Sequence, residues 1–297
     1  MRTKDGLPVQ ERIRHVVLRP TLSLEEAERK FKGRYLSRDD FDYCPTESVW
    51  GKFEDGTTAF IYLLNALPPY QHETTEWGLA KLKFNDVKNS RRSGLKKSKG
   101  GELVLGHVNF PFPRMAAHTA KQWEAYSHFM PLVQWLSATV QAWLPEYHAQ
   151  QVSIAAEQMD YLPWLDWHGW DGPHKPSKKD VAFWKKGLRD NPKARATFPI
   201  FSAFQINKST LFRSHADAKN EGGLACLTAF GKWAGGEFCL PRLRVAFPLQ
   251  PGSILIADKN NEQHGNIGPL VGNRISVVAY LRSMKAKAKV KAAGAGR

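Results

Sequence analysis

The chain has 297 residues, 42% of them hydrophobic, with 43 lysines and arginines against 28 acidic residues, a formal net charge of +15. Its length suits one large catalytic domain. It has no run of eighteen apolar residues, which argues against a membrane-spanning helix, and its three cysteines are too few for a disulfide framework. The polar, partly acidic N-terminus does not fit a signal or transit peptide, so we expect an intracellular protein.

The basic excess is concentrated in two polar stretches, residues 91–99 and 175–189. Such clusters release condensed counterions when they contact a phosphate backbone, so they favour a nucleic-acid partner over a merely solvated surface. A third basic stretch follows Met284; its low complexity predicts a disordered tail over 285–297.

The first part of the chain predicts elaboration around a later core. A serine followed by two glutamates predicts a short helix over Ser23–Lys32. Thr58–Leu67 is rich in β-branched and aromatic residues and predicts a buried strand that ends at two prolines. Over Thr119–Leu144, large apolar residues recur at helical spacing, which predicts two helices or one helix kinked at Pro131. We therefore expect a helical elaboration over about 1–195.

The segment Phe198–Leu281 contains short apolar runs separated by turn signals, the pattern of an antiparallel double-sheet barrel or jelly roll. The expected turns lie at Gly222-Gly223, Gly235-Gly236, Pro251-Gly252 and Gly272-Asn273. The predicted fold is α+β, with a double-stranded β-helix (jelly-roll) core over about 196–284 flanked by N-terminal helices. Together these parts form a single catalytic domain over 1–284.

His215 and Asp217 stand two residues apart, so on an extended strand their side chains point to one face, where one metal ion could bind both. An HxD triplet alone is weak evidence. His264 lies beyond a predicted strand that runs back along the barrel, and it completes a set of two histidines and one carboxylate. This set suits non-haem Fe(II) and leaves positions open for a co-substrate and dioxygen. Zinc hydrolysis is the competing use of these ligands.

Arg274 and Ser276 favour the iron interpretation. They follow His264 and share one strand face. A buried guanidinium on a barrel wall needs an anion, and its fork of donors matches a carboxylate. We expect that anion to be the distal carboxylate of 2-oxoglutarate, with Ser276 donating a further hydrogen bond. The alternative is that Arg274 pairs with an acidic residue of the core.

At these residues the sequence resembles the 2-oxoglutarate dioxygenases and, within them, the TET/JBP family of DNA base oxidases, most closely its compact fungal TET-like members. The resemblance covers about 198–282 and rests on the motifs HADAKN, GGEFCLP, PLQPGSILIAD, HGN and GNRISVVAY. It implies that Asn220, three residues after the metal Asp, contacts a flipped base. It also implies that Tyr280, six residues after Arg274, stacks on that base. Arg282 stands where such proteins often carry a histidine that bonds the pyrimidine.

The resemblance implies a dioxygenase that uses Fe(II), 2-oxoglutarate and dioxygen to oxidise a methylated base in double-stranded DNA. The foremost expectation is conversion of 5-methylcytosine to 5-hydroxymethylcytosine and further oxidised forms, after base flipping. We expect a monomer that acts in the nucleus and has no membrane partner. Two alternatives stay open: an AlkB-like enzyme that demethylates N6-methyladenine or another nucleic-acid base, and a non-catalytic barrel that binds nucleic acid.

Overall fold

The computed structural model describes residues 13–84, 101–108, 114–115, 125, 128–160, 200–217 and 220–282. The described helices are α1 (Leu24–Phe31), α2 (Pro69–Ala80), α5 (Met130–Trp143) and α6 (Pro145–Asp160), with short 3-10 helices η2 (Arg38–Asp40) and η5 (Pro241–Leu243). The described strands are β1 (Arg14–Leu18), β2 (Val49–Phe53), β3 (Thr58–Leu63), β4 (Gly101–Val108), β5 (Arg114–Met115), β6 (Ala203–Lys208), β7 (Asn220–Gly235), β8 (Phe238–Leu240), β9 (Val245–Phe247), β10 (Ile254–Asp258), β11 (Gly265–Asn266) and β12 (Leu270–Arg282).

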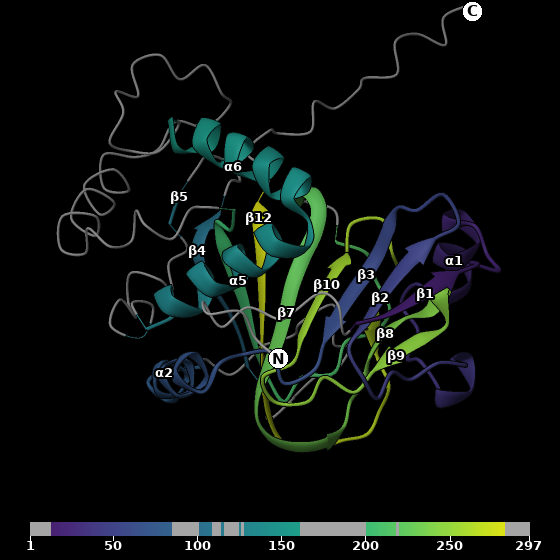
Figure 1. The fold of residues 1–297 in the computed structure, drawn as a ribbon. Coiled ribbons are helices and arrows are strands. Elements are labelled where there is room, and N and C mark those ends of the chain that lie inside the picture. Colours follow the sequence, from purple (N-terminus) through teal and green to yellow (C-terminus); the bar gives the residue numbers. More distant parts are fainter. Residues whose placement is uncertain are drawn as a thin grey trace, which may run out of the picture.

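Two sheets form the frame of the molecule. The large sheet has nine strands in the order β1-β2-β3-β10-β7-β12-β6-β4-β5, and the small sheet has the order β11-β8-β9. Neighbouring strands are antiparallel, apart from the parallel pair β1 and β2. Figure 1 shows α2, α5 and α6 on one side of the large sheet and the small sheet with α1 on the other. The predicted α+β jelly-roll fold is confirmed.

Alternation along β12 divides its side chains between two cores. Val277 and Ala279 pack in the cluster under the helices, whereas Val278 and Tyr280 pack in the cluster between the two sheets. Successive strand residues point to opposite faces, so Arg274 and Ser276 share the inner face with Val278. The strand thus brings two polar groups into the space between the sheets.

Several predicted elements are confirmed and some details differ. The helix at Ser23 is α1, which Ser23 and Glu26 close with a reciprocal capping box. The strand predicted from Thr58 is β3, which ends at Leu63, before the two prolines. Pro131 does not kink a helix. It lies in the first turn of α5, where a proline costs no intrahelical hydrogen bond.

Two of the predicted turns are wrong. Gly222-Gly223 lies inside the long strand β7, and Gly272-Asn273 lies inside β12. Gly272 has a positive φ of 101° where the two strands pass closely. A glycine in a strand can mark such a close approach as well as a turn. The turns at Gly235-Gly236 and Pro251-Gly252 are present, and their glycines also have positive φ.

The segment before residue 196 is less helical than expected, because β1 to β5 come from it and join the same large sheet. The division of the domain near residue 195 stays a prediction. Both predicted basic clusters, at 91–99 and 175–189, and the tail over 285–297 lie outside the described residues. None of the helices in the described ranges is long and apolar enough to cross a membrane.

Phe247 tests the packing between the two sheets. Its fully buried ring meets the rings of Phe60 and Tyr62, with centroids 4.8 and 5.3 Å away. We expect Phe247→Ala to lower the free energy of unfolding by about 3–5 kcal/mol in urea denaturation, because it leaves a cavity. The exposed Tyr70 is the control, and Tyr70→Ala should change stability by less than about 0.5 kcal/mol. Equal effects would contradict this packing.

Candidate active site

The structure brings His215, Asp217 and His264 together. Their ligand atoms all lie within 4.8 Å of one another. Nε2 of His215 lies 3.9 Å from Oδ1 of Asp217, and Nε2 of His264 lies 3.7 Å from Oδ2 of the same carboxylate. Two imidazoles and one carboxylate therefore face a common point that a metal ion could occupy.

Backbone pairing, not one regular strand, aligns these ligands. His215 lies in an irregular segment and forms an isolated antiparallel bridge with His264. The two residues exchange N–H···O bonds of 2.9 and 2.8 Å, and the N–H of Asp217 donates to the carbonyl of Lys259 at 2.7 Å. Side chains of directly opposed residues lie on one face. The expectation of an extended strand through the HxD triplet is thus wrong, although its ligands do converge.

Both histidines are oriented by hydrogen bonds to backbone carbonyls. Nδ1 of His215 lies 2.7 Å from the carbonyl oxygen of Arg213, and Nδ1 of His264 lies 3.1 Å from that of Glu262. A proton on Nδ1 leaves Nε2 as the free ligand atom. Nε2 of His264 is buried and has no hydrogen-bond partner within the described ranges. Burial, with the nearby positive charge of Lys259, lowers the pKa of His264 well below its usual range. The imidazole is therefore neutral at pH 7, as a metal ligand must be.

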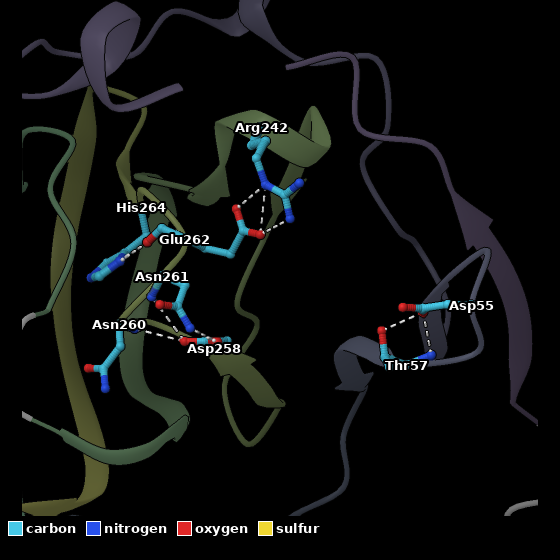
Figure 2. Close-up of polar contacts among 8 residues, drawn as sticks. All are labelled: Asp55, Thr57, Arg242, Asp258, Asn260, Asn261, Glu262 and His264. Atoms are coloured by element: carbon cyan, nitrogen blue, oxygen red, sulfur yellow. Dashed lines mark hydrogen bonds and ion pairs between the residues drawn. The ribbon is translucent and has the colours of Figure 1, made fainter. Parts of the chain in front are cut away.

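The segment from Asp258 to His264 positions two of the three ligands, and Figure 2 shows its polar contacts. The carboxylate of Asp258 accepts from the backbone N–H groups of Asn260 and Asn261 at 2.9 and 3.1 Å, which closes the turn after β10. Within this turn, Nζ of Lys259 lies 3.4 Å from Oδ2 of Asp217. The turn thus supports Asp217 through both a backbone and a side-chain contact.

A buried ion pair fixes the other end of this segment. Arg242, from η5, donates through Nε to both oxygens of Glu262, at 2.8 and 2.9 Å, and its Nη2 also bonds Glu262 (Figure 2). The two side chains are 13% and 6% exposed. Since the Glu262 carbonyl orients His264, this pair connects the small sheet to the metal ligand.

Arg274 lies in the same cavity and is held by two carbonyls. Its Nη1 donates to Gly236 and its Nη2 to Thr210, the latter at 3.2 Å. Gly236 is required there, since a Cβ on this residue would lie 2.8 Å from Nη1. Arg274 is 3% exposed, and burial lowers its pKa to about 10, so it stays charged at pH 7. The alternative that it pairs with a core acid fails, because in the described part of the chain it forms no ion pair.

The ligands and Arg274 line one cavity that encloses about 490 Å³ of space not filled by protein atoms, including its open side. Ser276 also lines the cavity, and its hydroxyl bonds to no other described residue. The remaining lining residues are Gln205, Asn207, Phe212, Leu227, Phe238, Leu249, Lys259, Gly265, Asn266 and Val278.

Three polar residues of this cavity are not indicated by the motifs of the sequence. Gln205 and Asn207 stand two apart in β6, and the amide nitrogen of Gln205 donates to the side-chain oxygen of Asn207 at 3.2 Å. Their alternation with the apolar Phe204 and Ile206 could have indicated them. Lys259 is 6% exposed, and its sequence context contains no signal of its burial.

Of the three residues expected to contact a base, the structure describes the side chain of Tyr280 and only the backbones of Asn220 and Arg282. Tyr280 shares the inner face of β12 with Arg274 and Ser276, as predicted, but it is 5% exposed and packs between the sheets beyond the cavity lining. The backbones of Asn220 and Arg282 are register partners where β7 and β12 meet. Their side chains lie outside what the structure describes.

These residues fit Fe(II) and 2-oxoglutarate. The metal point has a buried imidazole nitrogen that lacks a partner within the described ranges, and the His–Asp–His set leaves coordination positions for other ligands. Among the described residues, the charged side chains that line the cavity are one carboxylate, Asp217, and two cations, Lys259 and Arg274. A divalent metal adds positive charge, and a dicarboxylate co-substrate supplies the negative charge that this buried set lacks.

No family model and no curated protein matches the chain. Among solved structures, NgTET1 in complex with 5mC DNA is similar with a TM-score of 0.55 and 12% identity, over 92% of this chain and 83% of that chain. OsALKBH1 is similar over 75% and 97% of the two chains, at 11% identity and a TM-score of 0.37. A rice dioxygenase for auxin oxidation is similar over 92% of this chain and 84% of that chain, at 15% identity and a TM-score of 0.34. Only the first similarity is strong enough to support the fold.

His264 tests the metal site. We expect His264→Ala to weaken Mn(II) binding by more than about 100-fold in isothermal titration. Loss of a residue that only orients a ligand costs about 10–100-fold in metal affinity, and loss of the ligand itself should cost more. His72 packs against Phe230 on the helix side of the sheet, so His72→Ala is the control and should bind Mn(II) like the wild type. Unchanged affinity in His264→Ala would rule out this residue as a ligand.

Glu262 tests the support of that ligand. Glu262→Gln leaves a buried Arg242 unpaired, so we expect a loss of about 3–5 kcal/mol in unfolding free energy. We also expect Mn(II) affinity to fall by about 10–100-fold, because the carbonyl that orients His264 is no longer fixed. The double variant Arg242→Met with Glu262→Met removes both charges and should regain stability while its metal affinity stays low. Wild-type metal affinity in both variants would show that the ion pair does not position His264.

Proposed function

We propose that this chain is an Fe(II)- and 2-oxoglutarate-dependent dioxygenase that oxidises a methylated base in DNA. The observation that carries the enzyme class is Arg274, a buried cation without an acidic partner in the described structure that shares one cavity with the His–Asp–His set. When bound, Fe(II) and 2-oxoglutarate supply the activation of dioxygen for oxidation of a C–H bond. A zinc hydrolase would have no use for the Arg274 and Ser276 pair.

The residues of the chain divide the work in this proposal. His215, Asp217 and His264 hold the metal, and Lys259 keeps Asp217 in place through its ammonium group, 3.4 Å from Oδ2. Arg274 binds the distal carboxylate of 2-oxoglutarate with its remaining donors, and the Ser276 hydroxyl adds a hydrogen bond. Apolar side chains, among them Phe238 and Leu249, limit the access of water to the cavity.

The proposed substrate is 5-methylcytosine in double-stranded DNA, converted to 5-hydroxymethylcytosine and further oxidised forms. Three observations support it: the motifs shared with TET-like proteins, the net charge of +15, and a fold similar to that of NgTET1, solved in complex with 5mC DNA. The target methyl group lies inside a stacked duplex, so the base must flip out. In this proposal Tyr280 stacks on it, with Asn220 and Arg282 at its edge.

Tyr280 is buried, so in this proposal it has to become accessible when DNA binds. Demethylation of N6-methyladenine by the same cavity is the second candidate, because Arg282 stands where a pyrimidine-binding histidine is often found. A non-catalytic barrel would not need both a metal triad and Arg274. The monomeric state and the nuclear location stay predictions.

Mass spectrometry of nucleosides tests the substrate. The protein is incubated with Fe(II), 2-oxoglutarate and duplexes that carry 5-methylcytosine or N6-methyladenine. We expect 5-hydroxymethylcytosine from the first duplex and succinate in matching amounts. Asp217→Ala should form neither product while it binds the duplex nearly as well as the wild type, since phosphate contacts dominate affinity. Unchanged 5-methylcytosine together with loss of N6-methyladenine would contradict the proposed substrate and would identify N6-methyladenine as the substrate instead.

A further inference from the structure

The segment that follows α1 is hydrogen-bonded directly beside a metal ligand. The N–H of Gly33 donates to the carbonyl of Ser214 at 2.7 Å, and the N–H of Ser214 donates to the carbonyl of Arg34 at 2.8 Å. Ser214 immediately precedes His215, whose side chain is 20% exposed. Paired chains lie about 4.8 Å apart and successive Cα atoms about 3.8 Å. The backbone of Arg34 therefore lies within about 10 Å of that of His215.

This segment is strongly basic. From Arg29 to Arg38 the chain has five basic residues and no acidic one. Glu25 and Glu26 lie in the first turn of α1 and Glu28 pairs with Lys32, whereas Arg29 and Lys30 lie in the last turn, so the basic end of the helix adjoins the paired segment. Basic residues at a helix C-terminus compensate its dipole, which explains Arg29 and Lys30. It does not explain Arg34, which lies beyond the end of the helix.

Arg213 adds a further cation from the other side of the pairing. Its guanidinium carbon lies 4.8 Å from the ring centroid of Tyr35, a side chain that is 46% exposed. Nε of Arg213 is buried and has no hydrogen-bond partner in the described part of the chain. Arg34 bonds the carbonyl of Lys30 through Nη1 at 3.1 Å. Neither arginine forms an ion pair with a described acidic residue, so both charges are available to a ligand.

We propose that Arg34 and Arg213, with Tyr35 as the ring that orients Arg213, form a phosphate-binding surface for the duplex DNA whose base enters the cavity. This inference rests on the proposed function and concerns residues other than those of the two basic clusters at 91–99 and 175–189. The planar guanidinium presents a fork of donors that matches phosphate oxygens, and stacking on a ring fixes its plane. Duplex DNA is the occupant that fits, because the surface offers cations without acidic partners among the described residues. These cations belong to segments next to His215, which lines the cavity that must receive one base.

The surface is tested by fluorescence anisotropy with a labelled duplex over a range of salt concentrations. The variants are Arg34→Gln, Arg213→Gln and Arg213→Lys, and the control is Lys232→Gln, which removes an exposed charge in β7. Each glutamine variant should weaken binding by about tenfold and reduce the slope of log K against log salt by about 0.9. Arg213→Lys should keep the slope, and Lys232→Gln should match the wild type.

Further measurements distinguish a DNA-binding role of this surface from a structural one. Melting temperature and Mn(II) affinity should be unchanged in Arg34→Gln, which excludes a merely structural effect beside His215. Loss of affinity for single-stranded RNA or an acidic peptide, with unchanged duplex binding, would assign another occupant and overturn the proposal. Oxidation of methylated DNA by variants that bind like the wild type would overturn the surface but leave the proposed function intact. Weakened duplex binding by the variants, with no base oxidation by the wild type, would support the surface and overturn the proposed function.

Discussion

The site depends on one backbone interaction, the antiparallel bridge between His215 and His264. The two residues lie far apart in the chain, and their exchanged hydrogen bonds of 2.9 and 2.8 Å place both imidazoles on one face. Gly265 permits this approach, since a Cβ there would lie 3.0 Å from the backbone nitrogen of Ser214. Three other features adjoin this bridge. The turn of Asp258 and the Arg242–Glu262 pair lie in or contact the segment that leads to His264. The basic segment at Arg34 pairs with Ser214, next to His215.

The electrostatics of the cavity explain why the chain needs bound ligands. Burying a charge without a counter-charge is costly. Among the described residues, the lining of the cavity nonetheless holds Arg274 and Lys259 against the single carboxylate of Asp217. Arg274 is stabilised by carbonyl dipoles, which orient the guanidinium but do not neutralise it. The arrangement is therefore preorganised for an anion, and a divalent metal strengthens that requirement.

Much of this site could be predicted from the sequence because its residues lie on one regular strand or in a short motif. Strand alternation alone places Arg274, Ser276 and Tyr280 on the same face of β12. The HxD spacing identifies two residues whose ligand atoms do converge with that of His264, but long-range pairing and not an extended strand aligns them. Gly222-Gly223 and Gly272-Asn273 wrongly predict turns, because a local glycine signal does not distinguish a turn from a glycine inside a strand, such as Gly272, which lies close to the backbone of Lys232.

Other features depend on contacts distant in sequence and could not be predicted in this way. Lys259 and the Arg242–Glu262 pair acquire their roles only when the turn after β10 meets the small sheet and Asp217. The importance of Arg34 likewise follows from its pairing with Ser214, not from its neighbours in the chain.

The most direct test of the proposed dioxygenase site is isothermal titration of 2-oxoglutarate into the Mn(II)-loaded protein. We predict one site per chain in the wild type and a loss of at least about tenfold in affinity in Arg274→Gln, with Mn(II) affinity unchanged. Arg274→Lys should recover part of the loss, since it keeps the charge but not the fork. Equal 2-oxoglutarate affinity in the wild type and Arg274→Gln, or no binding to either, would contradict the assignment of this cavity to 2-oxoglutarate.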